Sequence, residues 1–456
     1  MKRIVFAFIL TLIISGVTVL LPAVSFAAAA PPEITAQTAI LIDAKTGQIL
    51  YEKNKDSLRE PASTTKVMTC LLALEHLPLN KVITIDAVSP FTGGSRIYVI
   101  EDEELTVEQL LYALMLESAN DAAVALAIAI SGSVEAFCDL MNERASDLGA
   151  KNPSYRNPSG LHAAGHFASA YDLAVVARHA MQNTKFRQIV STVQYTIPET
   201  NKQPERPYIH NTNRMLYDQA TRVPVRGVMR PAKYEGATGI KTGFTPQAGA
   251  SLVSSAMRDG TELIAVVLAT TDASRFGDSI ALLDFGFDNY YTHKAVDSSV
   301  EVEDVRVVRG AFNHVAAKIT EDRYITLPKE ASTALISTRI VMDEDITAPV
   351  RAGQVLGRVE IYEGVDLVDE VAITAVNGVV EGMFLSRFGI EDSTSEKIIK
   401  YAIIAGSVIG AILLLYVLVT VGYALRRRAK RRARALEIAM ERIAKERDVK
   451  QRQWPY

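Results

Sequence analysis

The most constraining feature of this 456-residue sequence is an apolar run close to its C-terminal end. Tyr401 to Leu425 contains no charged side chain. About 20 such residues span a bilayer as a helix, because a helix satisfies its own backbone hydrogen bonds in lipid. The segment from Arg426 to Arg432 follows at once and is almost entirely basic, which marks the cytoplasmic end of a span. We therefore predict a transmembrane helix at 401–425 and a basic cytoplasmic tail at 426–456.

The N-terminal segment has the features of an export signal. Lys2 and Arg3 precede an apolar run from Ile4 to Leu21, and Pro22 and small residues up to Ala28 follow. This order is typical of a signal peptide, which we place at residues 1–27. The run is also long enough to be a retained anchor. Under either interpretation the body of the protein is exported, which predicts a single-pass protein of the cell membrane with its body on the extracytoplasmic side.

Composition limits the kind of body that is exported. The chain is 48% hydrophobic and 22% charged, so it can bury a large core in two or three domains. The net charge is −3 although residues 426–456 alone contain 12 basic and 4 acidic side chains, so the body is acidic. An acidic body is unsuited to nucleic acid. Cys70 and Cys138 lie in apolar helical stretches, which predicts two buried thiols, with a single bridge as the alternative.

The pattern of apolar residues divides the body into two predicted domains. Residues 34–292 mix helical runs, such as Val107–Ile130, with strand-like runs at Ala250–Ala256 and Leu263–Ala269. Residues 296–385 contain short β-rich runs separated by turn residues, with little helical period, which predicts a small all-β domain. We expect a linker at 386–400 between this domain and the membrane helix.

Ser63 and Lys66 form the first candidate chemical motif. They stand three residues apart at the head of the apolar run Val67–Leu74, and Pro61 suits a helix start. Residues i and i+3 share one helix face, so the hydroxyl and the amine project together. A lysine can activate a serine only if burial or nearby cations lower its pKa. The alternative is an N-cap followed by a surface lysine.

Two further polar motifs follow in the chain. Ser118 and Asn120 lie in a polar segment, 117–121, which we interpret as a loop between two apolar helical runs. Lys241, Thr242 and Gly243 precede the strand-like runs, and glycine there allows close backbone approach to a ligand. A second Lys-Thr-Gly at 45–47 sits in a predicted hairpin turn and is interpreted as coincidental. His162 and His166 have the spacing of a metal pair, but flanking glycines predict a loop, and we expect no metal or other cofactor.

The three motifs together resemble a known enzyme family. Ser63-x-x-Lys66, Ser118-x-Asn120 and Lys241-Thr242-Gly243 in this order are typical of serine β-lactamases and penicillin-binding proteins. On an exported chain, the sequence resembles a low-mass penicillin-binding protein of the D-alanyl-D-alanine carboxypeptidase type, across roughly residues 34–384. The resemblance implies an α/β fold. Its catalytic domain would contain an antiparallel sheet flanked by helices, together with a helical subdomain. The small all-β domain and the membrane helix would follow.

The resemblance also implies roles for the site residues. Ser63 would attack the carbonyl between the two D-alanines of a peptidoglycan stem peptide, with Lys66 as base and Ser118 and Asn120 as polar partners. The substrate-binding set would comprise Lys241, Thr242, Gly243, Phe244 and Arg275. Within it, the backbone N–H groups of Ser63 and Phe244 would form an oxyanion hole. Arg275 would pair with the terminal carboxylate; the alternative is a surface arginine. β-Lactams would act as inhibitors.

Three other functions share these motifs. A β-lactamase of class A uses a glutamate to activate the deacylating water, and its E-x-x-x-N pattern is absent between Asn120 and Lys241. A membrane-tethered receptor that is acylated by β-lactams is compatible with the span and tail. A peptidoglycan-binding scaffold without activity is disfavoured by the intact motifs. Release of D-alanine, hydrolysis of antibiotic, or neither would separate these alternatives.

Overall fold

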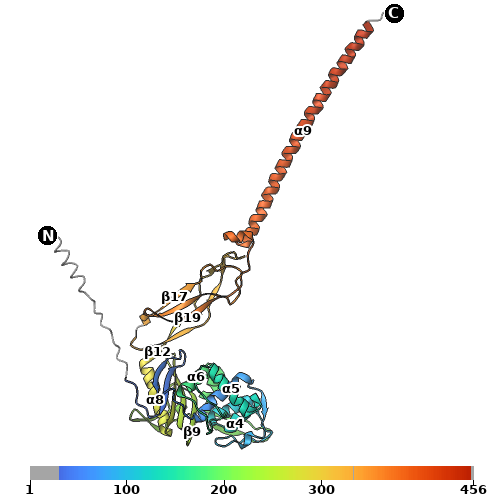
Figure 1. Cartoon of the computed structure of the whole chain (residues 1–456). Helices are drawn as coiled ribbons and strands as arrows, with labels where there is room; N and C mark the ends of the chain where they lie inside the picture. Colours follow the sequence, from blue (N-terminus) through green and yellow to red (C-terminus); the bar gives the residue numbers. More distant parts are fainter. Residues whose placement is uncertain (1–29, 332, 453–456) are drawn as a thin grey trace, which may run out of the picture. The chain divides into compact units, whose positions relative to one another are not determined.

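The computed structural model describes residues 30–331 and 333–452, and the predicted signal peptide lies outside this range. The chain forms two compact units (Figure 1). The first comprises residues up to Ala295 together with Arg323–Ile336, and the second comprises Val296–Asp322 and the residues from Ser337 onwards.

A five-stranded antiparallel sheet forms the centre of the first unit. Its strand order is β2-β1-β11-β10-β9, and each neighbouring pair is antiparallel. The bounds are β1 Thr38–Asp43, β2 Ile49–Lys53, β9 Ala237–Thr245, β10 Gly249–Arg258 and β11 Thr261–Thr270. The first eight residues of β11 are buried in succession, because helices cover both faces of the sheet. The strand β9, which carries the Lys-Thr-Gly motif, is an edge strand.

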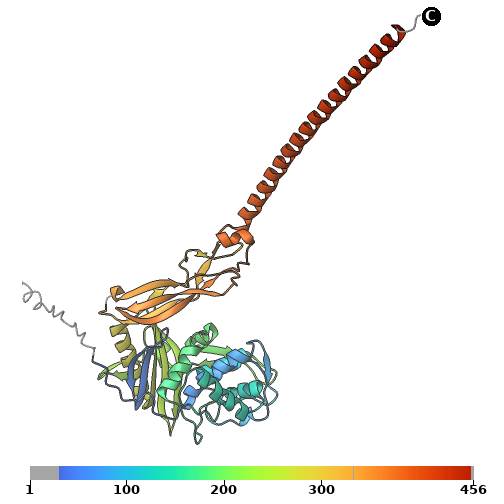
Figure 2. The same cartoon turned by 45° about the horizontal axis from the view of Figure 1, so that its top comes forward.

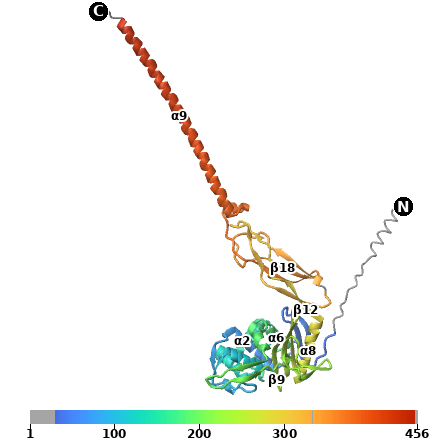
Figure 3. The same ribbon diagram turned by 180° about the vertical axis from the view of Figure 1, so that it is seen from behind.

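The sheet separates the first unit into two hydrophobic cores. Helix α8 packs on one face of the sheet, and α6 lies on the other face with α2 behind it (Figures 1 and 3). The larger core lies among the helices on the α2 and α6 side and includes the helical subdomain. The bounds are α2 Lys66–His76, α3 Val107–Tyr112, α4 Asn120–Ser131, α5 Val134–Asp147, α6 Ala170–Ala180, α7 Thr184–Ser191 and α8 Asp272–Asn289.

Short paired strands surround these elements. They are β3 Val82–Thr84 with β4 Glu104–Thr106, β5 Gln194–Ile197 with β6 Arg206–His210, β7 Arg222–Val225 with β8 Val228–Pro231, and β12 Tyr290–Val296 with β16 Arg323–Pro328. The strand β16 groups with the first unit although it lies within the residues expected to be all-β. It pairs with β12, and the Thr326 hydroxyl donates to the buried carboxylate of Asp43.

The second unit contains a β-rich part and the long helix α9. Its main sheet has the order β15-β19-β18-β17, and Figure 2 shows the β-rich part in yellow and orange and the long helix in red. The bounds are β13 Val305–Arg306, β14 His314–Val315, β15 Ala317–Ile319, β17 Ile336–Met342, β18 Val355–Glu363, β19 Asp366–Ala375 and α9 Asp392–Arg452. Among the described helices, α9 is long and apolar enough on its own to cross a membrane. The predicted fold class is confirmed in each of these parts.

Candidate active site

The first motif lies where a short 3₁₀ turn runs into helix α2. Ser63 lies in the turn η1, Ala62–Thr65, and Lys66 begins α2. The expected single helix from Pro61 is thus preceded by a tighter turn. Side chains at i and i+3 eclipse one another in a 3₁₀ turn, so this geometry brings the two groups together. Lys66 Nζ lies 3.0 Å from Ser63 Oγ.

The Lys66 amine has two further partners and no contact with solvent. Its Nζ lies 2.6 Å from Asn120 Oδ1 and 2.6 Å from the carbonyl oxygen of Ser159. Burial lowers the pKa of Lys66 well below its usual range, and the charge of Lys241 lowers it further. A neutral amine has two protons and one lone pair. When the amine is neutral, the two carbonyl-type oxygens can accept both of its protons, and the lone pair is then free to accept from the Ser63 hydroxyl.

The second motif lies at a break between two helical segments. This break is shorter than the loop expected at 117–121. A π-helical turn, η3 Ala113–Glu117, ends at Ser118, which has a left-handed φ of 64°, and α4 already begins at Asn120. The connecting segment is therefore two residues long. Ser118 Oγ is buried and has no hydrogen-bond partner among the described residues, so this hydroxyl is available to a substrate. Asn120 Nδ2 donates to the Gly93 carbonyl at 2.7 Å, which turns its Oδ1 towards Lys66.

The third motif brings the edge of the sheet against the nucleophile. A Cβ on Gly243 would lie 3.0 Å from the Pro61 carbonyl oxygen and 3.2 Å from the Ser63 backbone nitrogen, so glycine permits this close approach. Lys241 is 1% exposed, and burial followed by the nearby charge of Arg275 lowers its pKa to about 7. The side chain of Phe244, which follows Gly243 on β9, is 61% exposed.

Thr242 and Arg275 extend the polar surface next to this strand. The hydroxyl of Thr242 lies 2.6 Å from the hydroxyl of Thr212. Arg275, in the first turn of α8, is 8% exposed, which excludes a surface arginine. Its NH1 donates to the Gly243 carbonyl at 3.1 Å, and its NH2 lies 2.6 Å from Asp272. Arg275 therefore holds the end of β9 and places a positive charge there; its pairing with a substrate carboxylate stays a prediction.

The coincidental Lys-Thr-Gly lies in the hairpin turn between β1 and β2, as expected. Gly47 has a left-handed φ of 79°, and the Lys45 amine lies 5.1 Å from the centre of the Tyr324 ring. The Thr46 hydroxyl lies 2.6 Å from that of Thr326. These contacts give the motif a structural role in the turn.

The two histidines have separate partners within the protein. His166 is buried between the Thr65 hydroxyl and the Arg156 backbone N–H, and burial lowers its pKa to about 4. His162 instead faces the Glu60 carboxylate at 2.9 Å. Within residues 30–331 and 333–452, no group of three potential metal-ligating side chains is assembled. Both cysteines are free and buried.

Sequence reasoning missed three contributors to the site. The Ser159 carbonyl is a backbone group, and Thr212 is distant from the motifs in sequence, so side-chain patterns gave no signal for either. The third, Asp121, directly follows Asn120, and its charge raises the pKa of Lys66 against the effects of burial and Lys241. Asp121 lay in the polar segment 117–121 that was interpreted as a loop, so nothing in the sequence indicated that its carboxylate is buried.

Comparisons with known proteins agree with this fold and geometry. Residues 25–272 match the family described as D-alanyl-D-alanine carboxypeptidase, and residues 290–381 match the C-terminal domain of penicillin-binding protein 5. D-alanyl-D-alanine carboxypeptidase DacF of Bacillus subtilis is 33% identical over 358 residues, covering 77% of this chain and 87% of that protein. DacA of Haemophilus influenzae is 32% identical over 344 residues, covering 73% and 82%.

A solved structure supports the same relationship. The crystal structure of penicillin binding protein 5 from Haemophilus influenzae is 31% identical and superposes with a TM-score of 0.61, covering 77% of this chain and 99% of that one. The fold and the assembled motifs define a serine enzyme of the penicillin-binding class. The chain belongs to the D-alanyl-D-alanine carboxypeptidase family of serine-type hydrolases.

Proposed function

We propose that this protein is a membrane-anchored serine D-alanyl-D-alanine carboxypeptidase that trims the stem peptides of peptidoglycan through an acyl-enzyme on Ser63. Its helix α9 crosses the membrane once, with the catalytic unit on the extracytoplasmic side and the basic tail in the cytoplasm. β-Lactams acylate the same serine and inhibit the enzyme. Family membership supports the reaction class, and the apolar and basic segments of α9 support the topology.

The observation that carries this proposal is the environment of the Lys66 amine. A fully buried lysine that donates to two oxygens and lies 3.0 Å from Ser63 Oγ is arranged as a neutral base. A lysine that is buried in its charged form is normally paired with a carboxylate. No acidic side chain lies within 4.0 Å of this amine in the part of the chain that the structure describes.

Acylation follows from these groups. Ser63 Oγ forms a bond to the carbonyl carbon between the two D-alanines as its proton passes to Lys66 Nζ. The backbone N–H groups of Ser63 and Phe244 bind the oxyanion, and Gly243 allows β9 to come close enough to do so. The Thr242 hydroxyl and the cationic side chains of Lys241 and Arg275 receive the terminal carboxylate.

Release of product and hydrolysis complete the cycle. The tetrahedral intermediate collapses, and the bond to the terminal D-alanine breaks as its nitrogen takes a proton. The unpartnered Ser118 hydroxyl can relay this proton from Lys66. Water then attacks the ester carbon and loses a proton to Lys66 Nζ. The bond from that carbon to Ser63 Oγ breaks as Oγ takes this proton from Lys66, which regenerates Ser63 and frees the shortened peptide.

The direct test uses the full-length protein purified in detergent and a peptide ending in D-Ala-D-Ala. We expect repeated release of free D-alanine from this peptide. We expect no release of L-alanine from the same peptide ending in L-Ala-L-Ala. Hydrolysis of penicillin with the D-Ala-D-Ala peptide left intact would establish the β-lactamase alternative in its place.

A further inference from the structure

A buried carboxylate next to Asn120 has no part in the mechanism described so far. Asp121 is 0% exposed and lies in the first turn of α4. Its Oδ1 accepts from the backbone N–H of Ile97 at 3.3 Å and Ala122 at 2.9 Å, and its Oδ2 accepts from Val99 at 3.2 Å. In the described part of the chain, no basic side chain lies within 4.0 Å of it. Burial raises the pKa of Asp121, and its backbone donors act against this rise, because each of them favours the carboxylate over the acid.

The segment that Asp121 binds also holds the catalytic amide. Residues 93–99, here called the amide-holding segment, provide two carbonyls to Asn120. The Gly93 carbonyl accepts from Asn120 Nδ2 at 2.7 Å, and the Ser95 carbonyl accepts from its backbone N–H at 2.8 Å. The first contact decides which end of the amide faces Lys66. Asp121 thus holds the backbone of the segment that orients Asn120, and Asn120 is a hydrogen-bond partner of Lys66.

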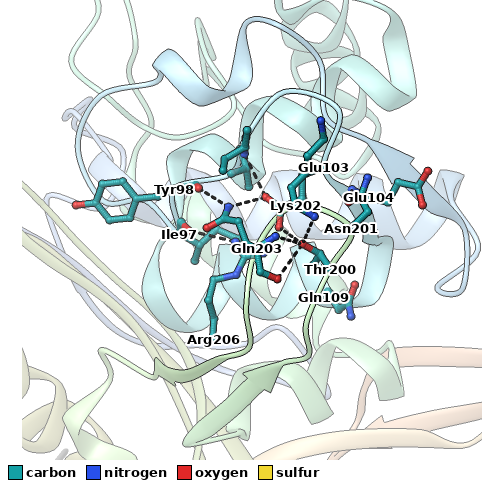
Figure 4. Close-up of polar contacts among 12 residues, drawn as sticks. Ile97, Tyr98, Glu103, Glu104, Gln109, Thr200, Asn201, Lys202, Gln203 and Arg206 are labelled. Carbon is teal, nitrogen blue, oxygen red and sulfur yellow. Dashed lines mark hydrogen bonds and ion pairs between the residues drawn. The ribbon is translucent and has the colours of Figure 1, made fainter.

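A second buried acid, Glu103, holds the same segment indirectly, through Arg206 and Gln203 (Figure 4). Glu103 is 0% exposed and forms an ion pair with Arg206, at the start of β6. Arg206 also donates to the Ile97 carbonyl at 3.2 Å, and Gln203 donates to the Tyr98 carbonyl at 2.8 Å. The connection between β5 and β6 and the start of β6 thereby hold two carbonyls of the amide-holding segment, whereas Asp121 holds two of its N–H groups.

The two buried acids differ in their electrical effect on the site. The charged groups that act on the Lys66 amine are Lys241, on β9, and Asp121, on α4. Arg275 and Glu117 act on Lys241 in turn. Glu103 is not among these groups, and its charge is already balanced by Arg206. Removal of either acid loosens the segment, but only removal of Asp121 also takes a negative charge from the vicinity of Lys66.

We propose that Asp121 is a positioning residue with two roles. It anchors the amide-holding segment so that Asn120 presents its oxygen to Lys66, and its charge offsets that of Lys241 at the amine. This inference rests on the proposed function of Ser63 and Lys66. It extends the functional constellation beyond the three motifs to a residue that does not touch the substrate.

The test measures kcat/KM for D-alanine release against pH in the full-length protein. D121N should lower the plateau of this pH profile, its pH-independent maximum of kcat/KM, about tenfold or more, because small displacements of catalytic groups are costly. It should also move the acid limb to lower pH by about one unit, because loss of a nearby negative charge lowers the pKa of Lys66. E103Q should lower the plateau and leave the limb in place. E205Q, which neutralises an exposed acid on the same hairpin, should change neither.

Two further variants protect the test against misfolding. D121S leaves room for a water to accept from the segment and carries the same expectations as D121N. G94A keeps Asp121, but its Cβ would lie 2.6 Å from Asn120 Nδ2, so it should lower the plateau without moving the limb. Thermal unfolding checks that each variant is folded.

Each outcome has a defined meaning. A lowered plateau together with a shifted limb in D121N and D121S, and a lowered plateau without a shift in E103Q and G94A, supports both roles of Asp121. An unshifted limb in folded D121N overturns the electrostatic role, and an unchanged plateau overturns the positioning role. A wild-type protein that neither releases D-alanine nor is acylated by penicillin overturns the proposed function itself, so the two failures are distinguishable.

Discussion

At the scale of single residues, the chemistry depends on how the buried Lys66 shares its protons. Its Nζ lies within hydrogen-bond distance of Ser63 Oγ, Asn120 Oδ1 and the Ser159 carbonyl oxygen, so a neutral amine that donates to the last two has its lone pair free for the Ser63 proton. Arginine keeps a positive charge at any working pH and cannot act as this base. We therefore expect K66R to lower the acylation rate with a fluorescent penicillin by about 10²–10⁴-fold. Acylation within threefold of the wild type would show that Lys66 is not the base.

Lys241 gives the site its expected response to alkaline pH. Burial and Arg275 lower its pKa to about 7, so its proton is lost as the pH rises through that value. Because the protonated form attracts the substrate carboxylate, we expect kcat/KM to fall on the alkaline side with a limb near this pKa. K241R remains charged, and its limb should move upward by at least about two units. An identical limb in both proteins would assign it to another group.

The motif side chains that meet at the candidate site could be picked out from the sequence, but the backbone groups of the site could not. Ser63, Lys66, Ser118, Asn120 and Lys241 stood out because their types and spacing match a known reaction. The Ser159 carbonyl has no side-chain signature, since every residue has a carbonyl. The contacts of Arg275 with Gly243 and Asp272 depend on where α8 meets β9, which the local sequence does not determine.

At the scale of elements, close backbone packing places the nucleophile. Gly160 has a left-handed φ of 83°, and a Cβ there would overlap the Ala62 carbonyl in the turn that carries Ser63. We expect G160A to lower the free energy of unfolding by about 2–5 kcal/mol and to reduce penicillin acylation, measured by denaturant titration and labelling. G149A is the matched control, with φ of 86° and open space around it.

The control separates strain from overlap. G149A should cost about 1–2 kcal/mol, from its left-handed backbone alone, and should retain acylation. Equal losses of stability and acylation in both variants would contradict a specific contact between residue 160 and η1.

Element boundaries followed from periodicity only where one pattern dominated. The runs expected at Ala250–Ala256 and Leu263–Ala269 correspond to β10 and β11, because long apolar strands have a strong signal. The polar segment 117–121 was expected to be a loop, yet α4 begins at Asn120. A polar residue facing an active site looks the same in sequence as one in a turn, so this boundary required the structure.

At the scale of the whole molecule, α9 is long and apolar enough to anchor the enzyme in a membrane. Its apolar part is followed by the basic segment Arg426–Arg432, which favours a cytoplasmic tail. We expect protease added to intact protoplasts to remove the catalytic unit and to leave an epitope placed after Arg434 intact. Detergent added before the protease should abolish this protection. Digestion of the epitope without detergent would contradict the orientation.

The fate of bound antibiotic distinguishes a carboxypeptidase from a β-lactamase. The leaving group of a β-lactam stays tethered and obstructs water, and the sequence lacks the E-x-x-x-N pattern that class A enzymes use. Each tenfold loss of deacylation rate corresponds to about 1.4 kcal/mol of barrier. We expect a penicillin adduct that lasts for many minutes. Its lifetime can be measured by intact-protein mass spectrometry. Loss of the adduct within seconds would contradict this account.

The central claim is that Ser63, activated by Lys66, removes a terminal D-alanine. The most direct measurement is the release of free D-alanine from a D-Ala-D-Ala peptide by the full-length protein and by S63A. The account predicts many turnovers for the wild type and none above background for S63A, with the two proteins unfolding at the same temperature. D-Alanine release by a folded S63A at a rate comparable to that of the wild type would contradict it.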